Sequence, residues 1–228
     1  MERQATGAIA ESVQQILSTI PDDVTLVAAA KGRRQSEIEA VIAAGITNIG
    51  HNYVQEARQT ITPALRQKAT WHMIGHLQKN KVNWAVRLFD VIETLDSVEL
   101  AHTLDRRCAG LGIIMPVLIE INSGREARKT GVLPEHLEEM VRAVADLEHI
   151  EIQGLMTMGP RFGDPQDARP YFRATRRAFE RLAGLELPGV TMRTLSMGMS
   201  NSYLVAIEEG ATMVRIGTRI FGSVVQAG

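Results

Sequence analysis

The stretch Val24-Thr25-Leu26-Val27-Ala28-Ala29-Ala30-Lys31 is an apolar run that ends on a single lysine, and a breaker, Gly32, follows it directly. Its length and composition predict a buried β-strand over 24–31. Ligands of parallel α/β folds bind at the carboxyl ends of the strands, which is where Lys31 is expected. A desolvated lysine there can lose its proton and form an imine with a carbonyl compound. A solvated lysine at a strand end is the alternative.

Outward from this run, strand-like and helix-like segments alternate along the chain. Helical spacing of apolar residues, as at Ile9, Val13 and Ile16, distinguishes the helices from the shorter apolar runs of the strands. The other predicted strands are 46–50, 70–76, 90–94, 114–121, 150–157, 191–196 and 212–216. The predicted helices are 3–19, 35–44, 52–67, 79–87, 97–109, 134–147, 168–183 and 201–209.

Eight strands with helices between them predict a parallel sheet with right-handed crossovers. We therefore expect an α/β fold, a single (β/α)8 TIM barrel with an extra N-terminal helix. One domain over 1–228 suits the length, because α/β barrels reach this size without dividing and no linker interrupts the chain. A doubly wound open sheet is the alternative, but no G-x-G-x-x-G motif follows the first strand.

Composition narrows the possible partners. The formal net charge of −1 gives no reason to expect nucleic acid or a membrane surface as a partner. The single cysteine, Cys108, excludes an internal disulfide, and neither a signal-peptide pattern nor an apolar run of membrane length is present. We therefore predict a cytoplasmic protein. No metal is expected, and His72 is interpreted as a hydrogen-bonded core histidine because no second ligand has suitable spacing.

The loops after the seventh and eighth strands are typical of a phosphate site. They contain Ser196-Met197-Gly198-Met199-Ser200 and Arg215-Ile216-Gly217-Thr218. Phosphate often binds at these two loops of a TIM barrel, because glycine lets the backbone approach an anion, and hydroxyl and backbone N–H groups then hold it. Two plainer roles stay open: Ser200 as the N-cap of helix 201–209, and Gly217 as a simple turn residue.

Arg215 lies between Val214 and Ile216 in the last strand, so alternation points its side chain into the barrel. A buried guanidinium stays charged and needs a partner, which is either a structural carboxylate or a ligand. An imine-forming lysine, a phosphate site and an inward arginine together describe a site for pyridoxal 5′-phosphate (PLP), which is held by a lysine imine and has a partner on its pyridine nitrogen.

Six segments of the chain resemble the PLP homeostasis proteins, also called the YggS/PROSC family, which are single barrels like that of bacterial alanine racemase. The segments occur in the family's order and span nearly the whole chain. They are Ala28-Ala29-Ala30-Lys31, Gly50-His51-Asn52-Tyr53-Val54-Gln55-Glu56, the stretch from Trp71 to Lys81, Gly154-Leu155-Met156-Thr157-Met158, Leu195-Ser196-Met197-Gly198-Met199-Ser200, and Met213-Val214-Arg215-Ile216-Gly217-Thr218 with Phe221-Gly222.

The resemblance implies a role for each matching position. Lys31 would hold PLP as an internal aldimine, and Arg215 would face the pyridine nitrogen. Asn52 and His76 would line the pocket near the ring. The phosphate would be bound by the Ser196–Ser200 loop, with Ser196, Met197, Gly198 and Ser200, and by Gly217 and Thr218. Asn122 and Lys129-Thr130-Gly131 match a further family segment, whose lysine is thought to affect cofactor exchange.

The chain departs from the family pattern at three positions. Gly32 stands where the family usually has threonine, and His51 where it usually has an acidic residue. Ser202 lies where an aspartate is common after the Ser-Met-Gly-Met-Ser loop. None is the lysine or a phosphate-loop residue, so PLP binding is still expected. Gly32 and His51 are expected to change affinity or the pH response of the pocket.

An arginine on the pyridine nitrogen donates a hydrogen bond but no proton, which makes the ring a poorer electron sink. Racemisation tolerates this but needs acid/base groups on both faces of the substrate carbon. The resembling racemases bring a tyrosine from a second domain, which is not expected in this chain, and Tyr53, Tyr171 and Tyr203 are interpreted as packing or helix-face residues. We therefore predict a PLP-binding protein without strong catalytic activity, and a monomer.

Its partners would be PLP, related B6 vitamers and PLP-dependent apo-enzymes, and its role to steady amino-acid and keto-acid pools. Two alternatives remain. One is a PLP-dependent amino-acid racemase acting through the barrel alone. The other is a phosphosugar barrel enzyme, for which the phosphate loops suffice and which predicts no imine at Lys31.

Overall fold

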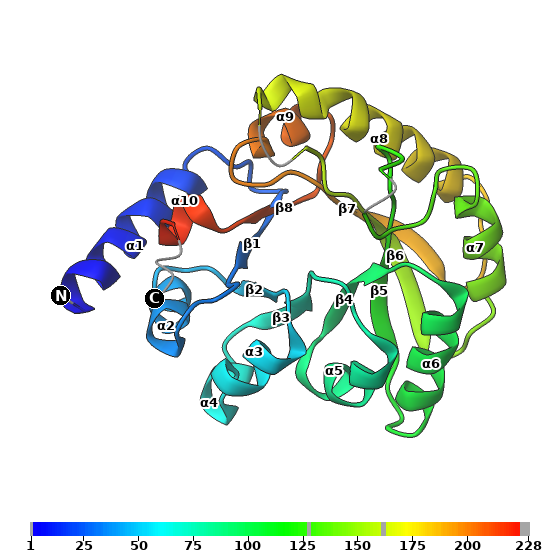
Figure 1. The fold of residues 1–228 in the computed structure, drawn as a ribbon, viewed down its shortest axis with the longest axis horizontal. Coiled ribbons are helices and arrows are strands. Elements are labelled where there is room, and N and C mark those ends of the chain that lie inside the picture. The colour runs from blue at the N-terminus through cyan, green and yellow to red at the C-terminus, as the bar shows by residue number, and fades with distance from the viewer. Residues whose placement is uncertain (1, 127–128, 161–162, 224–228) are drawn as a thin grey trace.

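A computed structural model describes residues 2–126, 129–160 and 163–223, with side chains from residue 6 onward. Eight parallel strands form a closed barrel in sequence order, and the last strand pairs with the first (Figure 1). This confirms the predicted barrel and excludes the open sheet. The strands are β1 Thr25–Ala29, β2 Asn48–His51, β3 Thr70–Met73, β4 Val91–Leu95, β5 Met115–Glu120, β6 Ile150–Met156, β7 Val190–Ser196 and β8 Met213–Ile216.

Helices surround the barrel and cover the outer face of the sheet (Figure 1). Among the described residues the α-helices are α1 Glu2–Leu17, α2 Gln35–Ala43, α3 Val54–Thr60, α4 Pro63–Arg66, α5 Val82–Leu88, α6 Val98–Ala109, α7 Leu137–Val144, α8 Arg169–Ala183, α9 Tyr203–Glu208 and α10 Thr218–Phe221. Two 3₁₀ turns, η1 Lys79–Lys81 and η2 Pro165–Ala168, precede α5 and α8.

Most predicted elements are confirmed, with shifted ends. The predicted helix 52–67 is instead two helices, α3 and α4, because the residue before a proline is disfavoured in helical conformation. Thr62, which precedes Pro63, is extended, and its hydroxyl accepts a hydrogen bond from the N–H of Leu65 as the N-cap of α4. Helix α10 was not predicted, since four residues are too few to show a helical period.

The core has an outer and an inner part. The outer part fills the space between sheet and helices, where Trp71, Phe89 and Phe172 are fully buried. In the inner part, Gly50 leaves room for the side chains of Val27 and Ile74. A Cβ on Gly50 would lie 3.0 Å from Val27 and 2.8 Å from Ile74, which is too close. The barrel axis is therefore filled by side chains, as expected for eight strands.

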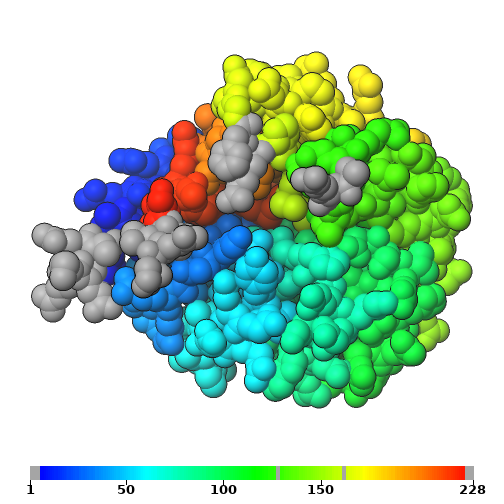
Figure 2. Space-filling model, viewed as in Figure 1, coloured from blue at the N-terminus to red at the C-terminus, as the bar shows by residue number. Residues whose placement is uncertain are grey.

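The seam between β8 and β1 brings the two ends of the described chain together. Helix α1 packs against both α2 and α10, and Figure 2 shows the blue N-terminal segment beside the red C-terminal segment. Arg33, in the loop after β1, donates to the carbonyls of Phe221, at 3.2 Å, and Gly222, and its guanidinium lies 5.0 Å from the centre of the Phe221 ring. The loop after β1 is thus held against the C-terminal end of α10.

Candidate functional site

Polar side chains from five strands form a hydrogen-bonded chain across the barrel interior. The ring of His72 contacts Asn48 Oδ1 at 3.1 Å through Nε2 and Glu93 Oε1 at 2.8 Å through Nδ1. The hydroxyl of Ser196 donates to Glu93 Oε2 at 2.7 Å and accepts from Arg215. Arg215 also donates to the carbonyl of Thr157 at 2.8 Å. The inward orientation of Arg215 and the hydrogen-bonded core position of His72 are confirmed.

Glu93 is the charge partner of Arg215. Its Oε2 lies 3.8 Å from Arg215 Nη1, and both side chains are at most 4% exposed. Burial by itself raises the pKa of Glu93, but the hydrogen bond from His72, the charge of Arg215 and the hydrogen bond from Ser196 outweigh it, so the pKa is lowered. The carboxylate therefore stays ionised, and the structural ion pair, one of the two partners considered for Arg215, exists.

Ser196 lies deeper than the sequence suggested. It is the last residue of β7, fully buried, and its hydroxyl is engaged by both Glu93 and Arg215. A hydrogen bond from the Ser196 hydroxyl to phosphate would break those bonds. An anion could therefore be bound here only by backbone groups and by the residues that follow Ser196. Ser196 is buried because β7 continues to this residue in the barrel wall, and the loop begins only after it.

Lys31 lies two residues beyond the end of β1, which stops at Ala29 instead of continuing to residue 31. Gly32 follows in a turn with φ of +67°, a conformation that glycine adopts readily, and its N–H donates to Glu56 Oε2 at 3.1 Å. Lys31 is exposed, and its Nζ lies 5.6 Å from the centre of the Tyr53 ring. The expectation of a desolvated lysine is therefore wrong for this structure.

The loops after β7 and β8 contact each other and approach β1. Ser200 Oγ accepts a hydrogen bond from the N–H of Gly217 at 3.3 Å, and a Cβ on Gly217 would lie 3.1 Å from the carbonyl oxygen of Ala29. Gly198 has φ of +94°. Ser200 is not the N-cap of α9, because the helix begins at Tyr203 with Ser202 as the cap position.

Backbone donors remain free at this contact. Within the described residues, no acceptor is bonded to the N–H of Ser200 or of Thr218, the first residue of α10. Met197 is fully buried and anchors the loop, and the hydroxyl of Ser202 accepts from the N–H of Met199 at 3.3 Å. Two loops with free N–H groups and hydroxyls thus lie side by side next to the end of β1, an arrangement that suits an anion.

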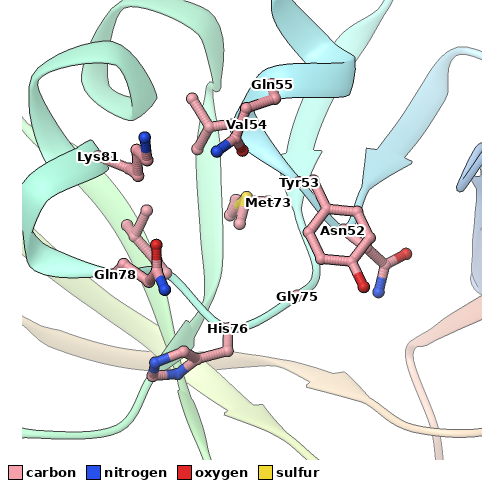
Figure 3. A pocket seen from close by; sticks show the side chains of 10 residues that line it. Asn52, Tyr53, Val54, Gln55, Met73, Gly75, His76, Gln78 and Lys81 are labelled. Carbon is pink, nitrogen blue, oxygen red and sulfur yellow. The ribbon is translucent and has the colours of Figure 1, made fainter.

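Asn52 and His76 lie on the neighbouring side of the mouth and line a cavity of about 400 Å³ between the segments after β2 and β3 (Figure 3). His76 Nδ1 contacts Asp96 Oδ2 at 3.1 Å. Gly75 allows the two segments to meet, because a Cβ there would lie 2.3 Å from the carbonyl oxygen of Asn52. Lys31, Arg215 and the two glycine loops are not among the lining residues, so the cavity adjoins the predicted cluster without containing it.

Sequence reasoning missed Glu120, a buried carboxyl group at the end of β5. It is 2% exposed, its Oε1 accepts from the hydroxyl of Thr130 at 2.9 Å, and its Oε2 has no partner among the described residues. Burial raises the pKa of Glu120. The sequence did contain a signal for Glu120, because this glutamate is a single charged residue at the end of an apolar strand, as Lys31 is a single charged residue just after one.

In the Glu120→Gln variant, we expect the free energy of unfolding to depend less on pH above 4.5, the ordinary pKa of a glutamate. The raised pKa means that the folded protein binds a proton which the unfolded chain loses, so this group lowers stability as the pH rises from 4.5 toward the raised value. Denaturant unfolding of wild type and variant between pH 4 and 8 measures the effect. An unchanged slope would show that Glu120 is ionised throughout.

His51, one of the departures from the family pattern, is a core residue. Its ring is fully buried and stacks on Trp71 with ring centres 5.9 Å apart. Because the hydroxyl of Thr60 donates to the carbonyl of Glu56, His51 Nε2 is the donor in the 3.3 Å contact with Thr60 Oγ1. Burial lowers the pKa of His51 to about 4.

Acid is therefore expected to destabilise the protein through His51. The neutral ring is favoured in the folded state, so its stabilisation is complete above pH 6.5 and is lost as the pH falls from 6.5 toward 4. The loss at pH 5 is about 2 kcal/mol relative to pH 7. Replacing His51 by phenylalanine keeps the stack on Trp71 and should remove this part of the acid sensitivity. Equal acid sensitivity of both proteins in denaturant titrations would contradict the assignment.

The described residues contain no helix long and apolar enough to cross a membrane. They also contain no group of three histidine, cysteine, aspartate or glutamate side chains arranged to hold a metal ion.

A closed barrel with one helix in front, a lysine beyond β1 and paired glycine loops beyond β7 and β8 defines the alanine racemase type of α/β barrel. The family model described as the N-terminal domain of alanine racemase matches residues 5–224. The pyridoxal phosphate homeostasis protein of Aquifex aeolicus is 41% identical over 178 residues, covering 78% of this chain and 77% of that protein. The chain belongs to this barrel family and, within it, to the pyridoxal phosphate homeostasis proteins.

Other relatives agree. The pyridoxal phosphate homeostasis protein of Escherichia coli K12 is 38% identical over 210 residues, covering 89% of this chain and 87% of that protein. PipY of Synechococcus elongatus, solved with PLP bound, is 33% identical with a TM-score of 0.86 over 94% of this chain and 100% of that chain. An alanine racemase of Clostridium difficile shares the fold at 14% identity, with a TM-score of 0.77 over 97% of this chain and 57% of that chain.

Proposed function

We propose that this protein binds PLP reversibly through Lys31 and serves in holding and delivering it, rather than in catalysis. The observation that carries the proposal is the convergence of three features at the seam of the barrel. Lys31 follows β1, Arg215 points inward from β8, and the free N–H groups of Ser200, in the loop after β7, and of Thr218, at the start of α10, lie beside them. The PLP bound to the similar PipY supports the choice of ligand.

The residues at the seam fit the chemistry of the group. The phosphate would be held by the backbone of Gly198 and by Ser200, Gly217 and Thr218, with no carboxylate among these residues to repel it. Arg215 donates through its two terminal nitrogens to Ser196 and Thr157, which leaves guanidinium N–H donors available for a ring nitrogen. PLP would supply an aldehyde for the Lys31 amine, and Asn52 and His76 would line the pocket beside it.

A carrier role is favoured over a racemase by the positions of the tyrosines. Tyr53 is 48% exposed instead of packed, and it is the tyrosine that contacts Lys31. Because Lys31 Nζ lies over the face of the Tyr53 ring, the two groups lie side by side, whereas racemisation requires acid/base groups on opposite faces of the substrate carbon. Tyr203 is buried, with its hydroxyl 2.8 Å from Thr19 Oγ1. The names of the curated relatives describe homeostasis and no reaction.

PLP-dependent apo-enzymes would be the protein partners of this chain. A protein that holds the aldehyde as an imine limits its free concentration and releases it to PLP-dependent apo-enzymes. The exposed position of Lys31 supports such exchange, since a second amine can reach the same carbon. The chain would act as one PLP-binding unit, and PLP and related phosphorylated B6 vitamers would be its small ligands.

Addition of PLP to the purified protein tests the proposal. An imine absorption band should form, and borohydride should reduce it to a secondary amine that mass spectrometry locates on the peptide with Lys31. The loaded protein should then activate an apo-aminotransferase. Chiral analysis of alanine, serine and glutamate after incubation separates the carrier from the racemase. Absence of any imine would overturn the proposal and leave the glycine loops to another phosphate compound, as in a phosphosugar enzyme.

A further inference from the structure

The cavity beside the seam has a chemistry of its own. It is formed by the segment after β2, which contributes Tyr53, Val54 and Gln55, and by the segment from the end of β3 into η1 (Figure 3). Its volume of about 400 Å³ lies in the range of small-molecule sites. The PLP proposal uses two of its residues, Asn52 and His76, and leaves the rest unexplained.

Lys81 is the charged group of this cavity. It is half-buried, lines the cavity, and has no carboxylate within 4.0 Å in the part of the chain that the structure describes. Lys79, two residues earlier in the same 3₁₀ turn, is exposed and forms an ion pair with Glu99. An ammonium group on a partly buried lysine without an internal counter-ion is an attractive position for an anion.

The other lining groups indicate the kind of anion. Gln55 and Gln78 offer amide N–H donors, and Met73 and Leu77 form an apolar surface. His76 is the other titratable nitrogen, and it already faces Asp96. None of the lining residues is acidic. An ammonium group with amide donors beside an apolar wall matches a carboxylate that carries a short carbon chain, whereas a bare inorganic anion would leave the apolar wall unused.

We propose that this cavity binds a small organic carboxylate, either an α-amino acid or its oxo acid, with Lys81 as the partner of the carboxylate. Tyr53 separates the cavity from Lys31, because it lines the one and contacts the other. A carboxylate bound at Lys81 would therefore lie in the cavity that adjoins the lysine assigned to PLP, with Tyr53 between that cavity and Lys31. The carboxylate site itself does not depend on PLP binding and is tested without it.

The test is an NMR titration of PLP-free protein with L-alanine, pyruvate, L-alaninamide and inorganic phosphate. We expect saturable shifts of the amides of residues 52–55 and 75–78 with alanine, pyruvate or both, and none with alaninamide. Alanine alone would identify amino acids as the source, and pyruvate alone oxo acids. Lys81→Gln should weaken binding at least tenfold and Lys81→Arg should restore it. The matched control Lys79→Gln should bind like wild type.

Three outcomes would overturn the carboxylate site. They are no saturable shift with either carboxylate, equal binding of inorganic phosphate, and unchanged binding by a folded Lys81→Gln variant. Because PLP is absent, each of these outcomes is distinguishable from a failure of the PLP proposal, which the imine band decides separately.

Discussion

Replacing Lys31 by alanine is expected to abolish the PLP imine completely. The imine requires a primary amine at the seam, and no other lysine among the described residues follows a strand beside the glycine loops. The variant should show no imine band and no borohydride-trapped peptide. The fold should be unaffected, because Lys31 is exposed and its recorded contact is with the face of Tyr53, itself half exposed.

Two further variants make the result specific. Lys31→Arg keeps the positive charge over Tyr53 but has no primary amine, so it too should fail to trap PLP. Lys79→Ala removes an exposed lysine that pairs with Glu99 and should trap PLP like wild type. Circular dichroism and thermal melting establish that all three are folded. A trapped adduct in Lys31→Ala would move the cofactor site to another lysine.

The second large effect is expected inside the barrel. Glu93→Gln should lower the free energy of unfolding by about 3–5 kcal/mol, because it leaves the buried guanidinium of Arg215 without its carboxylate. Both side chains are at most 4% exposed, so solvent does not screen the interaction between the two charges. Urea unfolding at pH 7 measures it. Glu99→Gln, which removes the carboxylate of an exposed pair, is the control and should change little.

A double-mutant cycle separates the ion pair from general damage to the core. Glu93→Gln combined with Arg215→Met removes both charges, and its cost should be well below the sum of the two single costs. Additive costs would show that the two side chains do not interact, and that the chain from Asn48 to Arg215 is held by its hydrogen bonds alone.

The positions of the strands along the chain could be predicted from sequence, because each strand is an apolar run that ends at glycine, proline or a polar residue. The split between α3 and α4 was missed, although Pro63 was a local signal for it because a proline disfavours a helical residue before it. The inward direction of Arg215 followed from alternation alone. These features are local, so they need no knowledge of which strands are neighbours.

The contacts across the barrel could not be predicted in this way. That His72 meets Glu93, and Glu93 meets Ser196 and Arg215, depends on register between strands and on closure of the ring. The exposure of Lys31 depends on where β1 ends, and alternation does not say that. Glu120 was missed because a glutamate at a strand end is ordinarily solvated, and only the packed structure shows the buried oxygen without a partner.

The position of the proposed site at the seam between β8 and β1 determines when during synthesis and folding the site is complete. Its residues come from opposite ends of the sequence, Lys31 from the first strand unit and Arg215 to Thr218 from the last. During synthesis the lysine therefore leaves the ribosome long before the loops that would bind phosphate, and contacts of such long sequence separation form slowly. The site exists only after the ring has closed. A ligand bound there would stabilise the closed barrel over partly folded forms, so PLP would also raise the free energy of unfolding of the protein.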